Sequence, residues 1–205
     1  MTRSLAAGIL AFALLASVGG ADDAGWQHRG ERDGIAIDER STGDSPVREL
    51  RLTTRSPVPP ATIMATLWRH EEYVQFLPYL KRLDVLRDDG DTKLIYEQLR
   101  VPVVKDRDLT VRVTRTASPD TGTYDIASVA APDEGPPETR DHVRVRTSAA
   151  RWHLTPAPDG GTNVTYTIRA DAGGLVPKWI VDTFERDAAI KILRAMLDRA
   201  RRNTP

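Results

Sequence analysis

The feature that most constrains this chain is one long amphipathic segment at its carboxyl end, which follows many short strand-like segments. Residues 175–202 carry apolar side chains at helical spacing. With a rise of about 1.5 Å per residue, such a helix is roughly 40 Å long, enough to cross a whole sheet. One long helix after a run of antiparallel strands predicts an α+β fold, with the helix packed on one face of the sheet.

One face of this predicted helix forms a wide apolar arc. Its members are Val181, Phe184, Ala188, Ile192, Ala195 and Met196. Glu185 falls within the arc, and the pattern gives no reason for its place there. A packed core accounts for the arc as well as the wall of a ligand cavity does, so both interpretations stay open.

Turn signals divide the region before the helix into short segments of strand character. We expect strands over residues 34–40, 47–55, 80–87, 92–100, 107–117, 121–129, 142–154 and 162–169. Pro57, Pro59 and Pro60 interrupt the strands after the second one, and Pro is favoured where a helix begins. We therefore expect two short helices inserted there, over residues 61–69 and 71–76.

The first 21 residues are not expected to belong to the fold. Arg3 provides a positive start, residues 5–18 are an apolar run, and three small residues end at Ala21. This order is typical of a secretory signal peptide with cleavage after Ala21. An uncleaved anchor is the alternative, although the run is shorter than the roughly 20 residues that span a bilayer. We expect a periplasmic or secreted protein with one domain over residues 22–205.

The composition excludes several classes of function. The chain has 29 Lys and Arg residues and 29 Asp and Glu residues, and this balance gives no electrostatic basis for nucleic-acid binding. It has no Cys, which excludes disulfides, thiol catalysis and zinc–thiolate sites. Its length suits a single hydrophobic core. We expect a monomer that does not bind nucleic acid.

Motifs of the common catalytic sites are missing from the sequence. There is no G-x-S-x-G elbow, no G-x-G-x-x-G loop and no phosphate-binding G-x-x-x-x-G-K-[ST] loop. His70-Glu71-Glu72 lacks the second His that a helical zinc site requires. Each of the four His residues is expected at the surface or at a strand edge. We therefore expect no catalytic residue, no metal site and no cofactor.

The segment Val101–Val113 places three charged residues between an apolar loop and a strand. Strand alternation directs Arg107, Leu109 and Val111 to one face and Asp108 to the other. If the apolar face is internal, Arg107 points inward, where an unpaired charge is costly. Glu97 on the preceding strand is a candidate partner. The alternative is that Arg107 pairs with Asp106 at the rim of the sheet.

Three segments resemble the START lipid-transfer domains, within the helix-grip group that includes Bet v 1-like proteins and polyketide cyclases. They are WQHRGERDGIAIDERS at 26–41, YEQLRVPVVKDRDLTV at 96–111 and GGTNVTYTIRADAGGLVPKWIVDTF at 160–184. The Arg107-Asp108 pair and the Gly173–Trp179 junction are the most specific parts. The family often has Trp in the proline-rich loop, where this chain reads Val101-Pro102-Val103-Val104, and an aromatic residue where it has Leu109.

The resemblance implies a curved antiparallel sheet that grips the terminal helix and encloses a cavity for one hydrophobic molecule. The loops at 100–107 and 131–140 are then at the mouth, and the terminal helix acts with them as a lid. On this basis the expected ligand-binding residues are Tyr96, Glu97, Arg107, Leu109, Val111, Trp152, Trp179, Phe184 and Ala188. Trp152 and Trp179 are also consistent with core or lid packing.

The function implied is binding, and with it transfer, of a lipid or other hydrophobic small molecule, without chemistry. Transient contact with a membrane is compatible with such a role. The alternative is a cyclase- or aromatase-like enzyme of the same fold class, with Tyr96, Glu97 and Arg107 as acid–base groups at the substrate. A third hypothesis is a filled domain that binds a partner protein through the loop around Pro136-Pro137.

Overall fold

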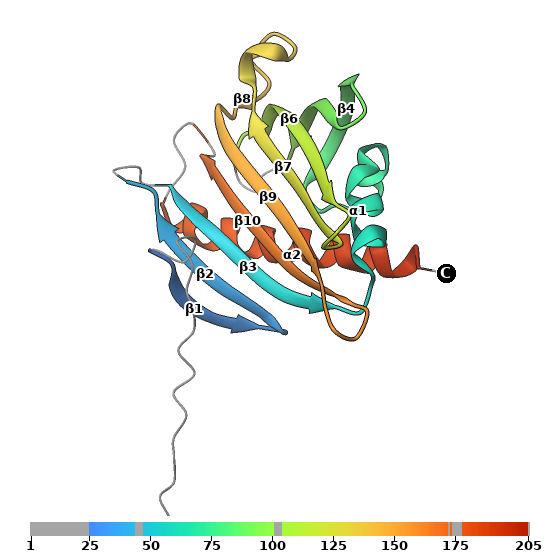
Figure 1. Cartoon of the computed structure of the whole chain (residues 1–205). Helices are drawn as coiled ribbons and strands as arrows, with labels where there is room; N and C mark the ends of the chain where they lie inside the picture. Colours follow the sequence, from blue (N-terminus) through green and yellow to red (C-terminus); the bar gives the residue numbers. More distant parts are fainter. Residues whose placement is uncertain (1–24, 44–46, 101–103, 172, 174–177, 205) are drawn as a thin grey trace, which may run out of the picture.

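The computed structural model describes residues 25–43, 47–100, 104–171, 173 and 178–204, with the backbone alone for residues 178–183 (Figure 1). The predicted signal peptide lies outside these residues. The elements in chain order are β1 (Gln27–Arg32), β2 (Ile35–Ser41), β3 (Arg48–Ser56), α1 (Pro60–Trp68), the 3-10 helix η2 (His70–Gln75), β4 (Leu80–Asp88), β5 (Thr92–Leu99), β6 (Arg107–Ser118), β7 (Thr123–Ala130), the 3-10 helix η3 (Pro132–Glu134), β8 (Val143–Arg144), β9 (Thr147–Pro156), β10 (Thr162–Asp171) and α2 (Lys178–Arg202).

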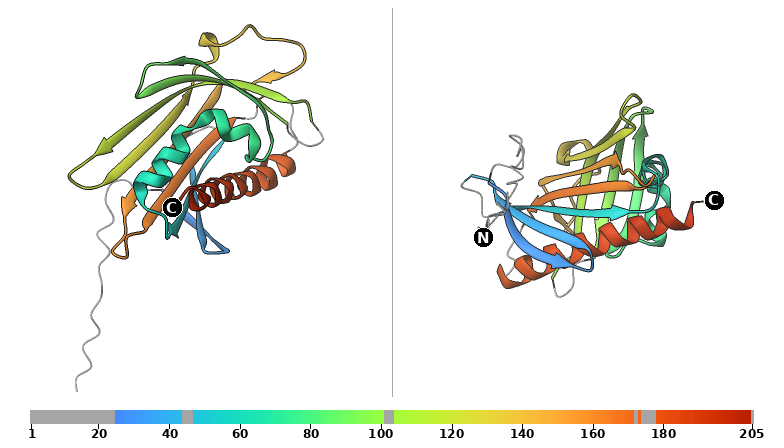
Figure 2. Two further views of the ribbon diagram at one scale, coloured as in Figure 1. Left: turned by 90° about the vertical axis from the view of Figure 1, so that its right-hand side faces the viewer. Right: turned by 60° about the horizontal axis from the view of Figure 1, so that its bottom comes forward.

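Ten strands of the described chain form one sheet in the order β1-β2-β3-β10-β9-β7-β6-β5-β4, with β8 beside β6. The short β8 pairs with β6 in parallel, and the other pairings are antiparallel. The sheet curves around α2, which lies along its concave side together with α1 and η2 (Figure 2). The predicted α+β helix-grip architecture, with two short helices after the first strands, is confirmed.

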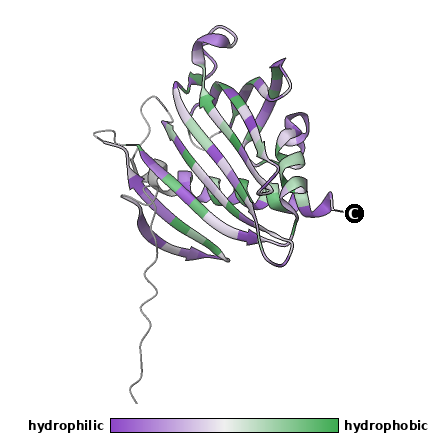
Figure 3. Cartoon of the chain, in the orientation of Figure 1, coloured by the Kyte–Doolittle hydropathy of each residue, from purple (hydrophilic) through white to green (hydrophobic). Residues whose placement is uncertain are grey.

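The core forms between the concave face of the sheet and the helices because strands such as β2 and β3 alternate apolar and polar side chains (Figure 3). Ile35 and Ile37 on β2 and Leu52 on β3 are buried on this face. The terminal helix adds Ile190 and Leu193, which are 2% and 0% exposed. Each such side chain stabilises the fold by about 1.5–3 kcal/mol relative to an exposed position. No helix in the described part of the chain has the length and apolarity needed to cross a membrane.

Two strands differ from the sequence expectation. β1 was not predicted because Gln27–Arg32 contains no apolar side chain from which an alternation can be read. The segment expected as one strand over 142–154 is divided into β8 and β9. The division arises because the amides of Val143 and Val145 donate to the carbonyls of Asp106 and Asp108, at 2.9 and 2.8 Å, and so hold this part of the chain beside β6.

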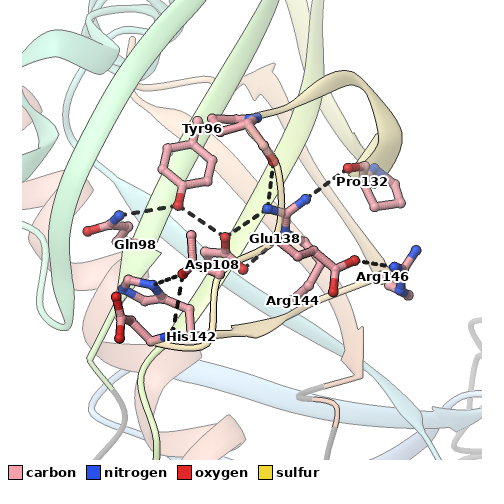
Figure 4. A network of polar contacts seen from close by, with 11 residues as sticks. Tyr96, Gln98, Asp108, Pro132, Glu138, His142, Arg144 and Arg146 are labelled. Atoms are coloured by element: carbon pink, nitrogen blue, oxygen red, sulfur yellow. Dashed lines mark hydrogen bonds and ion pairs between the residues drawn. The ribbon is translucent and has the colours of Figure 1, made fainter.

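A buried ion pair joins β8 to the convex side of β6 (Figure 4). Arg144 donates two hydrogen bonds to Asp108, from Nε at 3.0 Å and from Nη2 at 2.9 Å, and Tyr96 donates a third at 3.0 Å. The two charged side chains are 4% and 2% exposed. Burial alone would raise the pKa of Asp108, but the hydrogen bonds from Arg144 and Tyr96 outweigh it and lower that pKa.

The same arginine holds the loop between β7 and β8. Arg144 also donates to the carbonyl oxygens of Pro132 and Pro136, both at 2.9 Å. Between them, Gly135 lies so close to β6 that a Cβ atom there would stand 1.8 Å from Oγ1 of Thr110. Only Gly fits such a close approach. The loop is therefore fixed to the back of β6.

Removing one partner of this pair should destabilise the protein strongly. We expect Asp108→Ala to lower the free energy of unfolding by about 3–5 kcal/mol, because Arg144 is then buried without a counter-charge. Urea unfolding followed by circular dichroism measures this value. The matched control is Glu134→Ala, on the loop between β7 and β8. It breaks the exposed pair with Arg112 and should lower the free energy of unfolding by less than about 1 kcal/mol. Equal effects of the two substitutions would contradict the assignment.

Candidate functional site

A cavity of about 310 Å³ lies between the concave face of the sheet, η2 and α2. Its volume is at the lower end of the roughly 300–1,000 Å³ that is usual for small-molecule pockets. The wall is mainly apolar, because it is formed by the apolar side chains that the strands and α2 direct toward each other. The apolar lining residues include Leu50, Leu67, Leu99, Leu109, Val111, Val113, Ile126, Val145, Trp152, Ile168, Phe184, Ile192 and Met196.

The structure places most of the predicted ligand-binding residues around this cavity. Seven of the nine line it, namely Glu97, Arg107, Leu109, Val111, Trp152, Phe184 and Ala188. Tyr96 lies outside the lining, because its hydroxyl is held by Asp108 on the opposite side of the sheet. The side chain of Trp179 lies outside the described residues. That these residues touch a ligand stays a prediction.

Strand β6 shows why the prediction from alternation succeeds here. Arg107, Leu109, Val111 and Val113 line the cavity, while Asp108 faces the convex side. The register with β5 then places Glu97 opposite Leu109, and Leu99 opposite Arg107. The inward direction of Arg107 and the outward direction of Asp108 agree with the alternation of the strand.

Arg107 is the first residue of β6, and its side chain is hydrogen-bonded to Gly173, which precedes α2. Its guanidinium donates to the carbonyl oxygen of Lys105 and, at 3.2 Å, to that of Gly173. Burial lowers the pKa of Arg107, and the charge of Asp106 opposes this effect. Among the described residues, Glu97 makes no ion pair with Arg107, so the pairing considered from the sequence does not form. The register explains this, since the two residues are diagonal neighbours rather than opposite ones.

Glu97 is the polar group of the lining with the most unusual surroundings. It is partly buried and faces the cavity, and no hydrogen bond or ion pair reaches its carboxyl group within the described part of the chain. Burial raises the pKa of Glu97 from 4.5 to about 7. Tyr73 and Tyr166 lie near enough for its negative charge to add to the burial that raises their own pKa values.

His70 is a lining residue that the sequence interpretation missed. It was expected at the surface, but it is 4% exposed, and its Nδ1 has no hydrogen-bond partner in the described structure. Burial, helped by the charge of Lys93, lowers the pKa of His70 to about 4, so the imidazole is neutral near pH 7. Its ring centroid lies 5.0 Å from that of Tyr73. His70 lies in a 3-10 helix of six residues, which is too short for its spacing to signal the burial of His70 in the sequence.

Two further charged residues line the cavity. Arg48, at the start of β3, also pairs with Glu39 at 3.0 Å. Glu185, which had no explanation on the apolar arc of the helix, is in the cavity wall beside Ala188 and Ala189. The described residues include no cluster of three or more His, Cys, Asp or Glu side chains suited to a metal ion.

Comparison with known proteins supports the interpretation of the fold. A family model of the START domain matches residues 15–205. The crystal structure of a STAR-related lipid transfer protein from Xanthomonas axonopodis is similar, with a TM-score of 0.77 and 25% sequence identity. The match covers 86% of this chain and 99% of that protein chain. An uncharacterised protein of Pseudomonas aeruginosa is 26% identical over 193 residues, which cover 94% of this chain and 95% of that protein.

A more distant structural likeness concerns an enzyme. An aromatase/cyclase from a Streptomyces species has a TM-score of 0.57 and 15% identity, over 76% of this chain and 94% of the enzyme. At this identity the likeness shows a shared fold and carries no information about activity.

The raised pKa of Glu97 should give the protein a distinct dependence of stability on pH. The folded carboxyl group holds its proton up to about pH 7, whereas the unfolded one loses it near 4.5. The favourable contribution is therefore complete below about pH 4.5 and is lost as the pH rises through about 7. Relative to wild type, Glu97→Gln should be unchanged near pH 4 and more stable near pH 8, by up to about 3 kcal/mol.

Urea unfolding of both proteins at the two pH values measures this double difference. The titration of every other group cancels when the two proteins are compared at the same pH. A difference that is the same at both pH values would mean that Glu97 does not have a raised pKa.

Proposed function

Because the chain belongs to the START domain family, we propose that it binds a lipid or another hydrophobic small molecule in this cavity and transfers it. The observation that carries the proposal is the mainly apolar cavity of about 310 Å³ between sheet and terminal helix. The lipid-transfer role named for the Xanthomonas protein supports it. Burial of the ligand's apolar surface supplies about 25 cal/mol per Å².

The size of the cavity favours a small ligand. At about 310 Å³ it suits one hydrocarbon chain or one compact ring system better than a lipid with two long chains. The ligand lies along Val111 and Val113 of β6 and against Phe184, Ala188 and Ile192 of α2. The ligand enters beside Arg107, which lines the cavity and donates a hydrogen bond to the carbonyl oxygen of Gly173.

A cyclase-like enzyme is the second candidate, and Glu97 is the observation that favours it. A carboxyl group with a pKa of about 7 in an apolar cavity is suited to proton transfer near neutral pH. Of the three acid–base groups considered from the sequence, Glu97 and Arg107 line the cavity and Tyr96 does not. Recovery of the bound ligand chemically unchanged after prolonged incubation favours the carrier. Conversion that depends on Glu97 favours the enzyme.

We also propose that the protein is exported. The charged start, the apolar run and the small residues before Asp22 support this proposal. Expression of the full chain in a Gram-negative host, followed by fractionation and intact-mass measurement, should give a periplasmic product that begins at Asp22. A product of full length in the membrane fraction would indicate an uncleaved anchor instead.

A substitution that fills the cavity should abolish binding without unfolding the protein. Ala188 lies in the cavity wall on α2, so Ala188→Phe places a ring where the ligand lies. We expect it to weaken binding of a hydrophobic probe by more than about tenfold, equivalent to about 1.4 kcal/mol. The matched control is Asp198→Phe, which adds the same ring at an exposed position of the same helix.

Native mass spectrometry and solvent extraction of the purified proteins measure occupancy directly. Wild type and Asp198→Phe should carry the same co-purified ligand or take up an added one, and Ala188→Phe should be empty. Wild-type protein that is empty from every source and binds no hydrophobic probe would contradict the proposed function.

A further inference from the structure

Three arginine side chains converge on one buried carboxylate near the start of β3. Glu39 on β2 is 5% exposed and accepts hydrogen bonds from Arg29 on β1 at 3.1 Å and from Arg48 on β3 at 3.0 Å. Arg186 of α2 donates a third. Burial alone would raise the pKa of Glu39, but the hydrogen bonds from the three arginines outweigh it and lower that pKa. One ionised carboxylate cannot neutralise three guanidinium groups, so the cluster keeps an excess of positive charge.

Arg48 brings this charge to the cavity. It is the member of the cluster that lines the cavity, and its side chain is 49% exposed. Glu39 accepts from its Nη1, and within the described residues its Nε and Nη2 donate no hydrogen bond. Glu185 in the same wall offsets only one of the two excess charges. A guanidinium that is fixed on one side in this way is ready to bind a second carboxylate or a phosphate through its remaining N–H groups.

The register of the sheet places a serine hydroxyl in the same row as Arg48. On the concave face, Ser148 of β9 pairs with Ala170 of β10. Ala170 lies two residues beyond Ile168, which pairs with Leu50 of β3. Arg48 lies two residues before Leu50, so the antiparallel register continues the row from Ser148 through Ala170 to Arg48. Ser148, Ala170 and Arg48 all line the cavity.

A second hydroxyl comes from Ser128 on β7. Ser128 lines the cavity and pairs with Ala150, which makes it the diagonal neighbour of Ser148. Diagonal neighbours lie about 7–8 Å apart, within reach of one bound group. Neither hydroxyl forms a side-chain hydrogen bond within the described part of the chain. Two hydroxyls and one guanidinium are thus available to a ligand in a mainly apolar cavity as hydrogen-bond donors.

We propose that Arg48, Ser128 and Ser148 form an anion-binding subsite, which receives the carboxylate or phosphate of an amphiphile whose tail occupies the apolar part of the cavity. This inference rests on the proposed function. Carboxylate and phosphate oxygens accept hydrogen bonds, as three donors require, and their charge offsets the excess at the cluster. An ammonium group would instead be repelled by the same positive charge.

The strand directions set the direction of the bound molecule. Four antiparallel pairings separate β3 from β6, so the two strands run the same way, and Arg48 and Arg107 stand at the same end of the sheet. The guanidinium of Arg107 already donates to two backbone carbonyl oxygens. The anionic group therefore lies at Arg48. The tail extends toward Val113 on β6 and Met196 on α2, which line the cavity farther from this end.

Four ligands with the same chain and different polar ends test the subsite. Dodecanoic acid, dodecyl phosphate, dodecanol and dodecylamine each compete with the uncharged fluorescent probe Nile red for the purified protein at pH 6. At this pH a carboxylic acid is ionised, whereas Glu97, with a pKa of about 7, mostly holds its proton. In wild type we expect both anionic ligands to displace the probe at roughly tenfold lower concentration than the alcohol, as one hydrogen bond to a charged group predicts. The amine should require the highest concentration.

Arg48→Gln should remove the preference for the anionic ligands over the alcohol, and Ser148→Ala should reduce it. The matched control is Arg55→Gln, at the other end of β3. Arg55 is about as exposed as Arg48, at 51% against 49%, and pairs with Asp159 outside the cavity lining. Its substitution removes the same charge and should leave the ratio of affinities as in wild type. Thermal unfolding of each variant identifies any loss of fold.

Inorganic phosphate separates an amphiphile from a free anion. Added at the same concentration as dodecyl phosphate, it should not weaken the displacement of Nile red by that ligand, because it covers none of the apolar wall. If it does weaken that displacement, the subsite serves a free anion and the inference is wrong.

The outcomes separate this inference from the proposed function. If Nile red and all four ligands fail to bind wild type, the proposed function is wrong, and the inference falls with it. If they bind but wild type does not prefer the anionic ligands, the inference is wrong and the proposed function stands. A preference that survives unchanged in Arg48→Gln also overturns the inference, and would assign the anionic group to Arg107.

Discussion

The buried pair between Asp108 and Arg144 is the interaction on which the arrangement of the cavity depends. It holds β8 and the loop around Gly135 against the convex side of β6. In a regular strand, such as β6 where it pairs with β5, successive side chains point to opposite faces. When Asp108 is fixed on the convex side, Arg107 and Leu109 must therefore face the cavity. A contact outside the cavity thus determines which side chains line it.

The inward direction of a side chain follows from the sequence where an element is regular and carries a clear pattern. Leu109 and Val111 on β6, and Phe184 and Ala188 on α2, were assigned from alternation or helical spacing and lie in the wall. The pairing of Glu97 with Arg107 failed for another reason. Alternation gives the face of a residue but not its register, and the register places Glu97 opposite Leu109. Proximity across strands depends on pairing, which one strand's own sequence does not specify.

The features missed by the sequence interpretation have separate physical causes. β1 has no apolar side chain, so no burial pattern identifies it. Its backbone pairing with β2 makes it a strand. His70 belongs to a 3-10 helix of six residues, which is too short for periodicity to distinguish it from a loop. The division between β8 and β9 depends on backbone hydrogen bonds to Asp106 and Asp108, residues far away in sequence. The division of β8 and β9 therefore depends on a non-local contact, whereas β1 and η2 lack an apolar pattern long enough to be recognised.

The cavity has a consequence for the volume of the protein. The part of the cavity of about 310 Å³ that holds no water disappears when the chain unfolds and solvent surrounds its side chains. Hydrostatic pressure favours the state of smaller volume, and the volume change of unfolding scales with the voids that unfolding removes. The empty protein is thus the form more sensitive to compression, and a hydrophobic molecule that occupies the space removes part of that sensitivity. Occupancy of the cavity between the sheet and α2 and stability under hydrostatic pressure are therefore coupled in this fold.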